Sequence, residues 1–444
     1  MVSYTCDKCS KVFKQKGHFD THNNKKTPCN KDAPEKNTIV EAPVDYSGKS
    51  IKELVDLCKI QKIRGYSGKK KDEIIKLLNP PSQSQNTIEV APLQTDSSNY
   101  KLISLFSGMG GMDVGFSEQV VVHKLSVQAD YINSPHAIDG FVNLNRLPFD
   151  TVFQNDILPE AKLVCELNKW NHNFVLKDIR DLLKENYKFP NADVITGGFP
   201  CQDFSHAGKR QGFDSNRGTL YQSYVELVKR VKPIIFVAEN VNGLLTMPGE
   251  PIKKIIADFS AEGYEVKYQL IKCEEYGIPQ TRWRVIIMGI RLDKRVKLKT
   301  EDWNIITENK LKCPIRPYFK HLQEPSISQD PAQQVYSKAA RLEKGQGQKE
   351  INLDGPAPTM RAEHHGNIEF RRTTGGKNNE PNLEERRLSV REAALIQTFP
   401  PDCKLTEPNK KTSKAYKPIG NAVPPLLGYI IARKVNQILD QLKD

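Results

Sequence analysis

The stretch LISLFSGMGGMDVGF, residues 102–116, decides the fold of the larger part of this chain. Its apolar first half predicts a buried β-strand, and the glycines that follow predict a tight turn leading into a helix. Such a turn lets backbone amide groups approach a nucleotide-like ligand closely. Taken alone, the pattern indicates an α/β unit that binds a ligand.

Strand and helix patterns alternate from Lys101 onward. Apolar β-rich runs occur at residues 192–199, 234–241 and 284–290, and helical patterns occur at residues 157–168 and 224–231. This alternation predicts an α/β fold built on a parallel sheet with helices on its faces.

Reactive side chains follow these predicted strands. Pro200-Cys201-Gln202 ends one strand, and Glu239 and Asn240 end the next. Gln280, Arg282 and Arg284 lead into a further strand. In open α/β sheets, ligands bind in the crevice at the carboxyl ends of the strands, where a cysteine is well placed for nucleophilic attack.

Six motifs together carry a family resemblance. In chain order they are FSGMGG (106–111), PCQ (200–202), ENV (239–241), Q-x-R-x-R (280–284), RLSVREAALIQTFP (387–400) and GNAVPP (420–425). From about Leu102 to the C-terminus the chain resembles the DNA (cytosine-5)-methyltransferases. The resemblance implies a Rossmann-like methyltransferase fold with a small inserted target-recognition domain. It implies an enzyme that transfers a methyl group from S-adenosylmethionine to carbon 5 of a flipped-out cytosine in double-stranded DNA.

The resemblance assigns catalytic roles to four residues. Cys201 is the thiolate that adds to carbon 6 of cytosine, because carbon 5 is a poor nucleophile until that addition. Glu239 protonates or hydrogen-bonds N3 and accepts a hydrogen bond from the exocyclic amine. Arg284 donates to the O2 edge of the base, and Arg282 supports the same pocket.

The resemblance also implies a set of cofactor-binding positions. They are Phe106, Gly108, Gly110, Asp156, Ile157, Asp178, Ile179, Pro200, Leu220 and Asn421. The acid that binds the ribose remains open between Asp156 and Asp130. Asp130 lies nearer the expected spacing from the glycine-rich turn, whereas Asp156 follows a predicted strand and precedes an amphipathic helix. We prefer Asp156, which requires an insertion spanning about residues 118–150.

The same resemblance divides the catalytic region. Residues 101–299 and 386–444 are expected to form the two parts of the methyltransferase domain. Residues 300–385 are expected to recognise the target sequence, and from Glu301 to Glu385 they carry 12 basic and 13 acidic groups.

A zinc finger is predicted in residues 1–31. The spacing Cys6-x2-Cys9-x12-His22 resembles that of a C2H2 finger of the ββα type, with Phe13 and Phe19 as its small core. The fourth ligand departs from the pattern. We assign it to Cys29, which gives a C2HC set, with His18 as the alternative.

A second module is predicted at residues 46–79, between linkers at 32–45 and 80–100. Two amphipathic helical patterns there flank a loop with glycines, and the segment resembles a SAP domain, a helix-loop-helix unit that binds DNA. Lys69, Lys70 and Lys71 at a helix start can donate to phosphates. The alternative is a basic helical hairpin that contacts protein.

The composition indicates the class of binding partner and the cellular location. The 444 residues carry a net charge of +13, which favours a polyanionic partner, here double-stranded DNA bound by a monomer. The sequence has no stretch of about 20 apolar residues and no signal peptide, and its 9 cysteines are odd in number and mostly scattered. A soluble intracellular protein is expected, with cytoplasm and nucleus not distinguished.

Two competing functions are weighed against this one. A cytosine-5 RNA methyltransferase is disfavoured by the SAP-like module. A catalytically silent DNA-binding scaffold is disfavoured because Cys201, Glu239 and Arg284 are all present. The target sequence and the biological role, whether restriction-modification, regulation or service to a virus, stay open.

Overall fold

The computed structural model describes most of the chain after residue 98. The described residues are 4–5, 12–13, 50–51, 54–55, 58, 70–78, 99–200, 219–298, 303–306, 310–336, 349–362, 370–372, 386–407 and 413–442. Its contacts divide the chain into two compact units, Met1–Gln94 and Thr95–Asp444.

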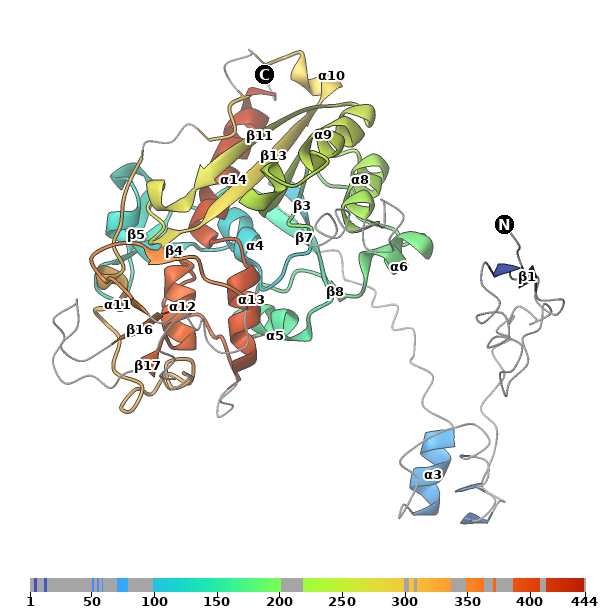
Figure 1. Cartoon of the computed structure of the whole chain (residues 1–444), viewed down its shortest axis with the longest axis horizontal. Helices are drawn as coiled ribbons and strands as arrows, with labels where there is room; N and C mark the ends of the chain where they lie inside the picture. The colour runs from blue at the N-terminus through green and yellow to red at the C-terminus, as the bar shows by residue number, and fades with distance from the viewer. Residues whose placement is uncertain are drawn as a thin grey trace. The chain divides into compact units, whose positions relative to one another are not determined.

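A seven-stranded sheet forms the centre of the Thr95–Asp444 unit (Figure 1). Its spatial order is β11 (Tyr264–Lys272), β13 (Trp283–Arg291), β10 (Ile235–Val241), β9 (Val194–Gly197), β3 (Tyr100–Leu105), β7 (Phe149–Asp156) and β8 (Phe174–Leu176). The strands from β10 to β8 run parallel to one another. The α/β class predicted from the sequence is confirmed.

The predicted parallel sheet has an antiparallel strand near one edge. β13 pairs antiparallel with both β10 and β11. Only residues 273–282 connect β11 to β13, and they hold a 3₁₀ turn and the short strand β12 (Gln280–Thr281) instead of a crossover helix. Because a parallel return needs a crossover of about a dozen residues or more, the chain comes back antiparallel.

Helices cover both faces of the sheet. Those of the unit are α4 (Gly111–Ser117), α5 (Pro159–Asn168), α6 (Ile179–Lys184), α8 (Thr219–Val231), α9 (Pro251–Ala261), α10 (Leu292–Arg295), α11 (Arg316–Phe319), α12 (Val390–Ile396), α13 (Tyr416–Asn421) and α14 (Pro425–Gln441). One apolar core contains residues of α6, α8 and α9, and the other contains residues of α4, α12 and α14.

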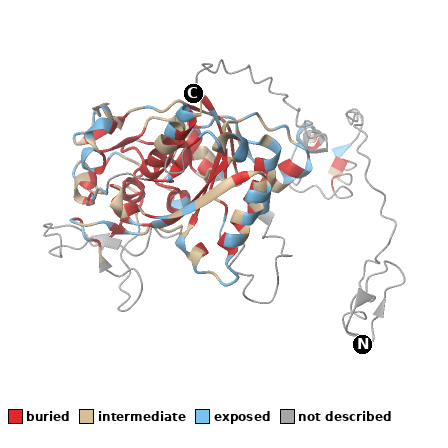
Figure 2. Cartoon of the chain, turned by 90° about the horizontal axis from the view of Figure 1, so that it is seen from above, coloured by how far each residue is buried: buried red, intermediate tan, exposed pale blue. Residues whose placement is uncertain are grey.

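Side-chain alternation along the strands feeds these two cores. On β10, Val237 belongs to the core with α4 and α14, and Phe236 to the core with α8 and α9. Because successive strand residues point to opposite faces, a continuous apolar run is buried on both sides. Figure 2 shows this burial concentrated along the sheet and its flanking helices.

A small antiparallel sheet separates α4 from β7. It contains β4 (Val121–His123), β6 (Phe141–Leu144) and β5 (Ile132–Pro135), in that order. These elements fall within residues 118–150, where the sequence suggested an insertion. They lengthen the chain between the glycine-rich turn and β7 without interrupting the central sheet.

Short strands lie in the expected recognition region and beside it. β14 (Lys349–Glu350), β16 (Phe370–Arg372) and β17 (Arg386–Arg387) form one sheet, and β15 (Ala357–Pro358) pairs with β12. The β12–β15 pair joins this region to the segment that precedes β13.

In the Met1–Gln94 unit, β1 (Tyr4–Thr5) pairs antiparallel with β2 (Val12–Phe13). Farther along, Lys71–Leu78 forms helix α3, and Leu54, Cys58 and Ile74 are buried. The predicted zinc ligands Cys6, Cys9, His22 and Cys29, and the alternative His18, lie outside the described residues.

None of the helices in the described part of the chain combines the length and the apolar character that crossing a membrane requires.

Candidate active site

An acid and a base meet at the carboxyl end of β10. Glu239 lies on β10 and Arg284 at the start of β13, and their side chains form an ion pair with Nε and Oε1 2.6 Å apart. Both residues are less than a tenth exposed. The pair forms because β13 runs antiparallel to β10, which brings the start of β13 to the end of β10. Because the pair is largely buried, removal of one partner would leave the other charge buried and uncompensated.

The segment that leads to Cys201 passes beside Glu239. A Cβ atom on Gly198 would lie only 2.9 Å from Oε2 of Glu239, so the backbone here approaches the carboxylate as closely as glycine allows. Asn240 Nδ2 donates to the carbonyl of Phe199 at 3.0 Å. Pro200 follows and is exposed, and Cys201 lies outside the described residues. The chain is thus fixed beside Glu239 up to two residues before Cys201.

Arg282 has partners of a different kind. Its guanidinium donates to the backbone carbonyls of Met360, Gly420 and Ala422, at distances from 2.9 to 3.2 Å. The residue is 1% exposed, and this burial lowers its pKa to about 9. Through these contacts Arg282 connects the start of β13 to the segments that contain Met360 and Gly420–Ala422.

The glycine-rich turn leaves open space where a ligand can lie. Phe106, Gly108 and Gly110 have φ angles of 50°, 55° and 81°. A Cβ on Gly108 would meet no atom within 4 Å, so this position faces unfilled space. The backbone is therefore exposed to an incoming group, as a nucleotide-type cofactor requires.

Asp156 lies beside this turn. Its Oδ2 accepts a hydrogen bond from the Gly108 N–H at 2.8 Å, and its Oδ1 accepts from Ile157 and Leu158. Burial raises the pKa of Asp156, and the three N–H groups oppose that shift. Asp130, the alternative, is exposed in the 3₁₀ turn Ala129–Tyr131 of the inserted sheet. The geometry at the turn therefore favours Asp156 as the acid.

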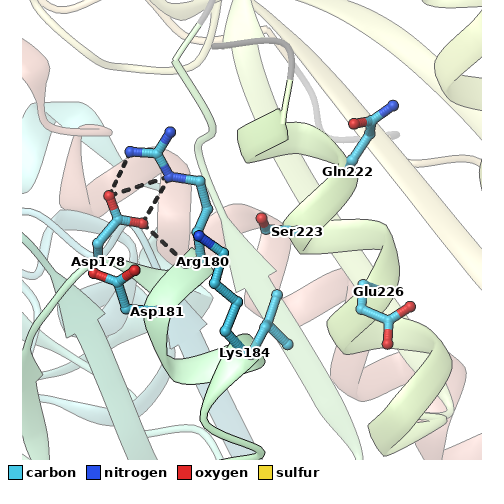
Figure 3. A pocket seen from close by; sticks show the side chains of 8 residues that line it. Asp178, Arg180, Asp181, Lys184, Gln222, Ser223 and Glu226 are labelled. Carbon is cyan, nitrogen blue, oxygen red and sulfur yellow. Dashed lines mark hydrogen bonds and ion pairs between the residues drawn. The ribbon is translucent and has the colours of Figure 1, made fainter. Parts of the chain in front are cut away.

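Asp178 begins α6 and caps it. Its carboxylate accepts from the backbone N–H of Arg180 and pairs with the Arg180 guanidinium at 2.6 Å, which lowers the pKa of Asp178. Figure 3 shows the pair at a pocket of about 590 Å³ whose walls are residues of α6 and α8. The lining side chains are mostly charged or polar: Asp178, Arg180, Asp181, Leu183, Lys184, Gln222, Ser223 and Glu226.

The remaining predicted cofactor residues fall into two groups. Ile179 belongs to the core that contains α6, α8 and α9, and Phe106 and Leu220 pack against that core. Ile157 is 62% exposed, and Asn421 is exposed at the end of α13. The first group thus packs in or against the core of α6, α8 and α9, whereas the second faces outward.

Three amides support the site but received no role from the sequence. Besides Asn240, Gln280 accepts from the Met360 N–H at 2.8 Å and donates to Gln397 at 2.8 Å. Gln397 in turn donates to the carbonyl of Ile419. Both glutamines lie inside motifs that the sequence identified. Their hydrogen-bond partners lie more than twenty residues away, so the motifs did not reveal these contacts.

Within the described ranges, no cluster of three or more histidine, cysteine or acidic side chains has a metal-binding arrangement.

A family model described as "C-5 cytosine-specific DNA methylase" matches residues 100–437. Among similar proteins, the Type II methyltransferase M.BspRI of Lysinibacillus sphaericus is 35% identical over 379 residues, covering 79% of this chain and 85% of the relative. The Type II methyltransferase M.BsuRI of Bacillus subtilis is 34% identical over 373 residues, covering 78% and 81%.

Solved structures share the fold at low sequence identity. The methyltransferase EhMeth of Entamoeba histolytica superposes with a TM-score of 0.53 at 17% identity, covering 78% of this chain and 99% of the other. The Dnmt2 methyltransferase of S. pombe gives 0.50 at 18% identity, covering 78% and 100%. The match to the family model spans the central sheet, the Glu239–Arg284 pair and the glycine-rich turn. This chain therefore belongs to the family of C-5 cytosine-specific DNA methylases.

Proposed function

We propose that the chain methylates carbon 5 of a flipped-out cytosine in double-stranded DNA through a covalent bond between Cys201 and carbon 6. The observation that carries this proposal is the buried Glu239–Arg284 pair, beside which Gly198 and Phe199 lead directly to Cys201. In this proposal, a nucleophile, an acid and a cationic donor would act together on a single base.

The chain's own residues would act in sequence. The Cys201 thiolate forms a bond to carbon 6, and the displaced electron pair moves toward N3, which takes the proton of the Glu239 carboxyl group in its protonated form. Arg284, paired with Glu239 at 2.6 Å, orients that carboxyl group and donates to O2. After carbon 5 has taken the methyl group, a base takes its proton, N3 returns its proton to Glu239, and the Cys201 thiolate departs, which restores the aromatic ring. These atoms are stacked inside a duplex, so the base must first flip out.

Two features fit a bound methyl donor. The open space at Gly108 leaves room for it, and Asp156, which accepts from Gly108 N at 2.8 Å, would hold its ribose. Phe106, Ile179 and Leu220 would contact its adenine, with Asp178 at the edge. When bound, S-adenosylmethionine supplies an electrophilic methyl group.

We propose from the sequence that residues 1–31 form a zinc finger and residues 46–79 a SAP-like module. The paired strands Tyr4–Thr5 and Val12–Phe13 flank Cys6 and Cys9, as the knuckle of a zinc finger would require. Helix α3 and the buried Leu54, Cys58 and Ile74 suit a small SAP-like helical unit. Zinc content that is stoichiometric in the full chain and lost in the Cys6→Ser/Cys9→Ser variant is the expected result.

Sequence specificity is assigned to residues 300–385, and phosphate binding to the basic parts outside them. The relatives' designation as Type II methyltransferases supports a role in restriction and modification. The buried reduced cysteines at 58, 165, 273, 313 and 403 suit an intracellular place of action.

Tritium transfer tests the reaction and the substrate together. With labelled S-adenosylmethionine, duplex DNA should acquire label in 5-methylcytosine, and transfer RNA should not. Label found in RNA alone would contradict this proposal and indicate that the chain is an RNA methyltransferase. The absence of transfer to both substrates, with cofactor binding intact, would favour the silent scaffold.

A further inference from the structure

A buried carboxylate lies behind the glycine-rich turn and has no place in the reaction described above. Asp113, in the first turn of α4, is completely buried. An ionised carboxyl group in such a position is costly unless its oxygens accept hydrogen bonds. Burial raises the pKa of Asp113 to about 6, although its hydrogen bonds oppose the shift.

The carboxylate joins three elements. Oδ2 accepts from the Ser104 hydroxyl on β3 at 3.0 Å, and Oδ1 accepts from Gln154 Nε2 on β7 at 3.0 Å. Ser104 and Gln154 are direct neighbours in the register of β3 and β7. One side chain on α4 therefore bridges two adjacent strands below the site.

The orientation of Gln154 leaves Asp113 as its acceptor. The backbone N–H of His172 donates to Gln154 Oε1 at 2.8 Å, which turns the amide NH₂ group toward Asp113. His172, whose charge acts on Asp113, pairs through its side chain with Glu118. Removing the carboxylate would leave a buried amide donor without its partner.

This network is continuous with the residues that face the methyl donor. Asn155 and Asp156 directly follow Gln154 on β7. The Asn155 carbonyl accepts from the Ser107 N–H at 3.0 Å, and Asp156 accepts from the Gly108 N–H at 2.8 Å. The position of β7 at Gln154 therefore sets the position of Asp156 against the turn.

We propose that Asp113 is a positioning residue for the methyl donor, holding α4 and β7 against β3 so that Gly108 and Asp156 keep the spacing that donor binding requires. This inference rests on the proposed function. It predicts that loss of the carboxylate weakens donor binding specifically, because the Glu239–Arg284 pair lies on other strands.

The test is calorimetric titration of the full-length protein with S-adenosylmethionine. Asp113→Ala should weaken binding by about tenfold, because two buried partners lose their acceptor. Asp113→Asn should stay within about threefold of the parent, since its amide oxygen can accept from Gln154 while the Ser104 hydroxyl turns to accept from its NH₂ group. Ser117→Ala is the matched control. It removes contacts with Thr151 and with the Asp113 carbonyl, but it lies at the end of α4 away from the glycine-rich turn, so binding should change by less than about twofold.

A swap separates positioning from general loss of structure. In Ser104→Asp/Asp113→Ser the carboxylate moves to β3, opposite Gln154, and the hydroxyl moves to α4. This variant should bind the donor better than Asp113→Ser alone. In methylation assays, Asp113→Ala should raise the KM for S-adenosylmethionine while the KM for DNA stays unchanged.

Specific results would overturn the inference. They are unchanged donor affinity in Asp113→Ala, equal rises in both KM values, or a folded swap variant that binds no better than Asp113→Ser. If the single variants do not fold, a folded swap variant with parental affinity supports the inference and one with weak affinity contradicts it. Absence of binding by the parent protein would instead refute the proposed function.

Discussion

Among single residues, Glu239 is the one on which the proposed proton transfer to N3 depends. Replacing it by Gln removes the proton that N3 requires, and general acid–base groups contribute about 10²-fold to 10⁴-fold to rate. We expect Glu239→Gln to lower kcat by at least about 10²-fold while the protein still folds and binds S-adenosylmethionine. Steady-state methylation of duplex DNA measures this.

Glu274 offers a matched control for that substitution. Its Oε1 accepts from Trp283 Nε1 at 3.0 Å, so it lies at the same end of β13, in contact with the residue next to Arg284. Glu274→Gln keeps this acceptor and should retain kcat within about threefold. Equal losses in the two variants would mean that charge in this region, and not proton transfer by Glu239, matters for the rate.

The raised pKa of Asp113 predicts a pH dependence of stability. Its folded-state pKa of about 6 lies above the ordinary aspartate pKa of 3.8, so the folded protein binds this proton more tightly than the unfolded chain does. The stability of the parent should therefore fall as pH rises from about 4 to above 6, by up to about 3 kcal/mol from this group.

Asp113→Asn removes that titration. We expect the difference in melting temperature, variant minus parent, to be larger at about pH 8 than at about pH 4.5. Scanning calorimetry of both proteins at these two pH values measures it. A difference that is constant or falls with pH would show that Asp113 does not have a raised pKa.

At the scale of elements, the contact of α4 with α14 holds the glycine-rich turn in place. A Cβ on Gly115 of α4 would lie 2.4 Å from the backbone of Gly428 and Tyr429 on α14. Gly115→Ala should destabilise the protein by about 2 kcal/mol or more, because backbone atoms must move apart, and urea unfolding would measure this. At Gly243, where the nearest atoms are 3.9 Å away, the same change should cost less than about 0.5 kcal/mol. Equal losses of stability in the two variants would mean that α4 and α14 can move apart at little cost.

Local patterns predicted much of the fold and site, and long-range contacts account for what they missed. Residues 102–116 predicted strand, turn and helix correctly, because the apolar run and the glycines act within one short segment. The direction of β13 depends on how residues 273–282 connect it to β11, which apolar periodicity does not encode. The partners of Arg282 lie 78 to 140 residues along the chain, so spacing within its motif could not identify them.

At the scale of the whole molecule, the net charge of +13 is unevenly distributed. Residues 1–99 contribute +5, residues 100–300 contribute +3, residues 301–385 contribute −1 and residues 386–444 contribute +6. Because phosphate contacts are electrostatic and carry no sequence information, we propose that residues 301–385, which are nearly neutral, read the bases.

Removing residues 1–99 tests this division. The truncated protein should bind DNA more weakly, and its log–log dependence of affinity on salt should be shallower by about 2 or more, since each lost phosphate contact contributes about 0.9. Fluorescence anisotropy at several salt concentrations measures the slope. The methylated sequence should not change, and a new target site after truncation would contradict the assignment of specificity to residues 300–385.

We propose that Cys201 carries methyl transfer to carbon 5 of cytosine in DNA. Bisulfite sequencing of plasmid DNA from cells that express either the parent or Cys201→Ser tests it most directly, at equal protein levels. We expect cytosines protected from bisulfite conversion at one recurring sequence with the parent and none with the variant. Protection that survives in the Cys201→Ser variant would contradict the mechanism, and a plasmid left unprotected by the parent would contradict the activity itself.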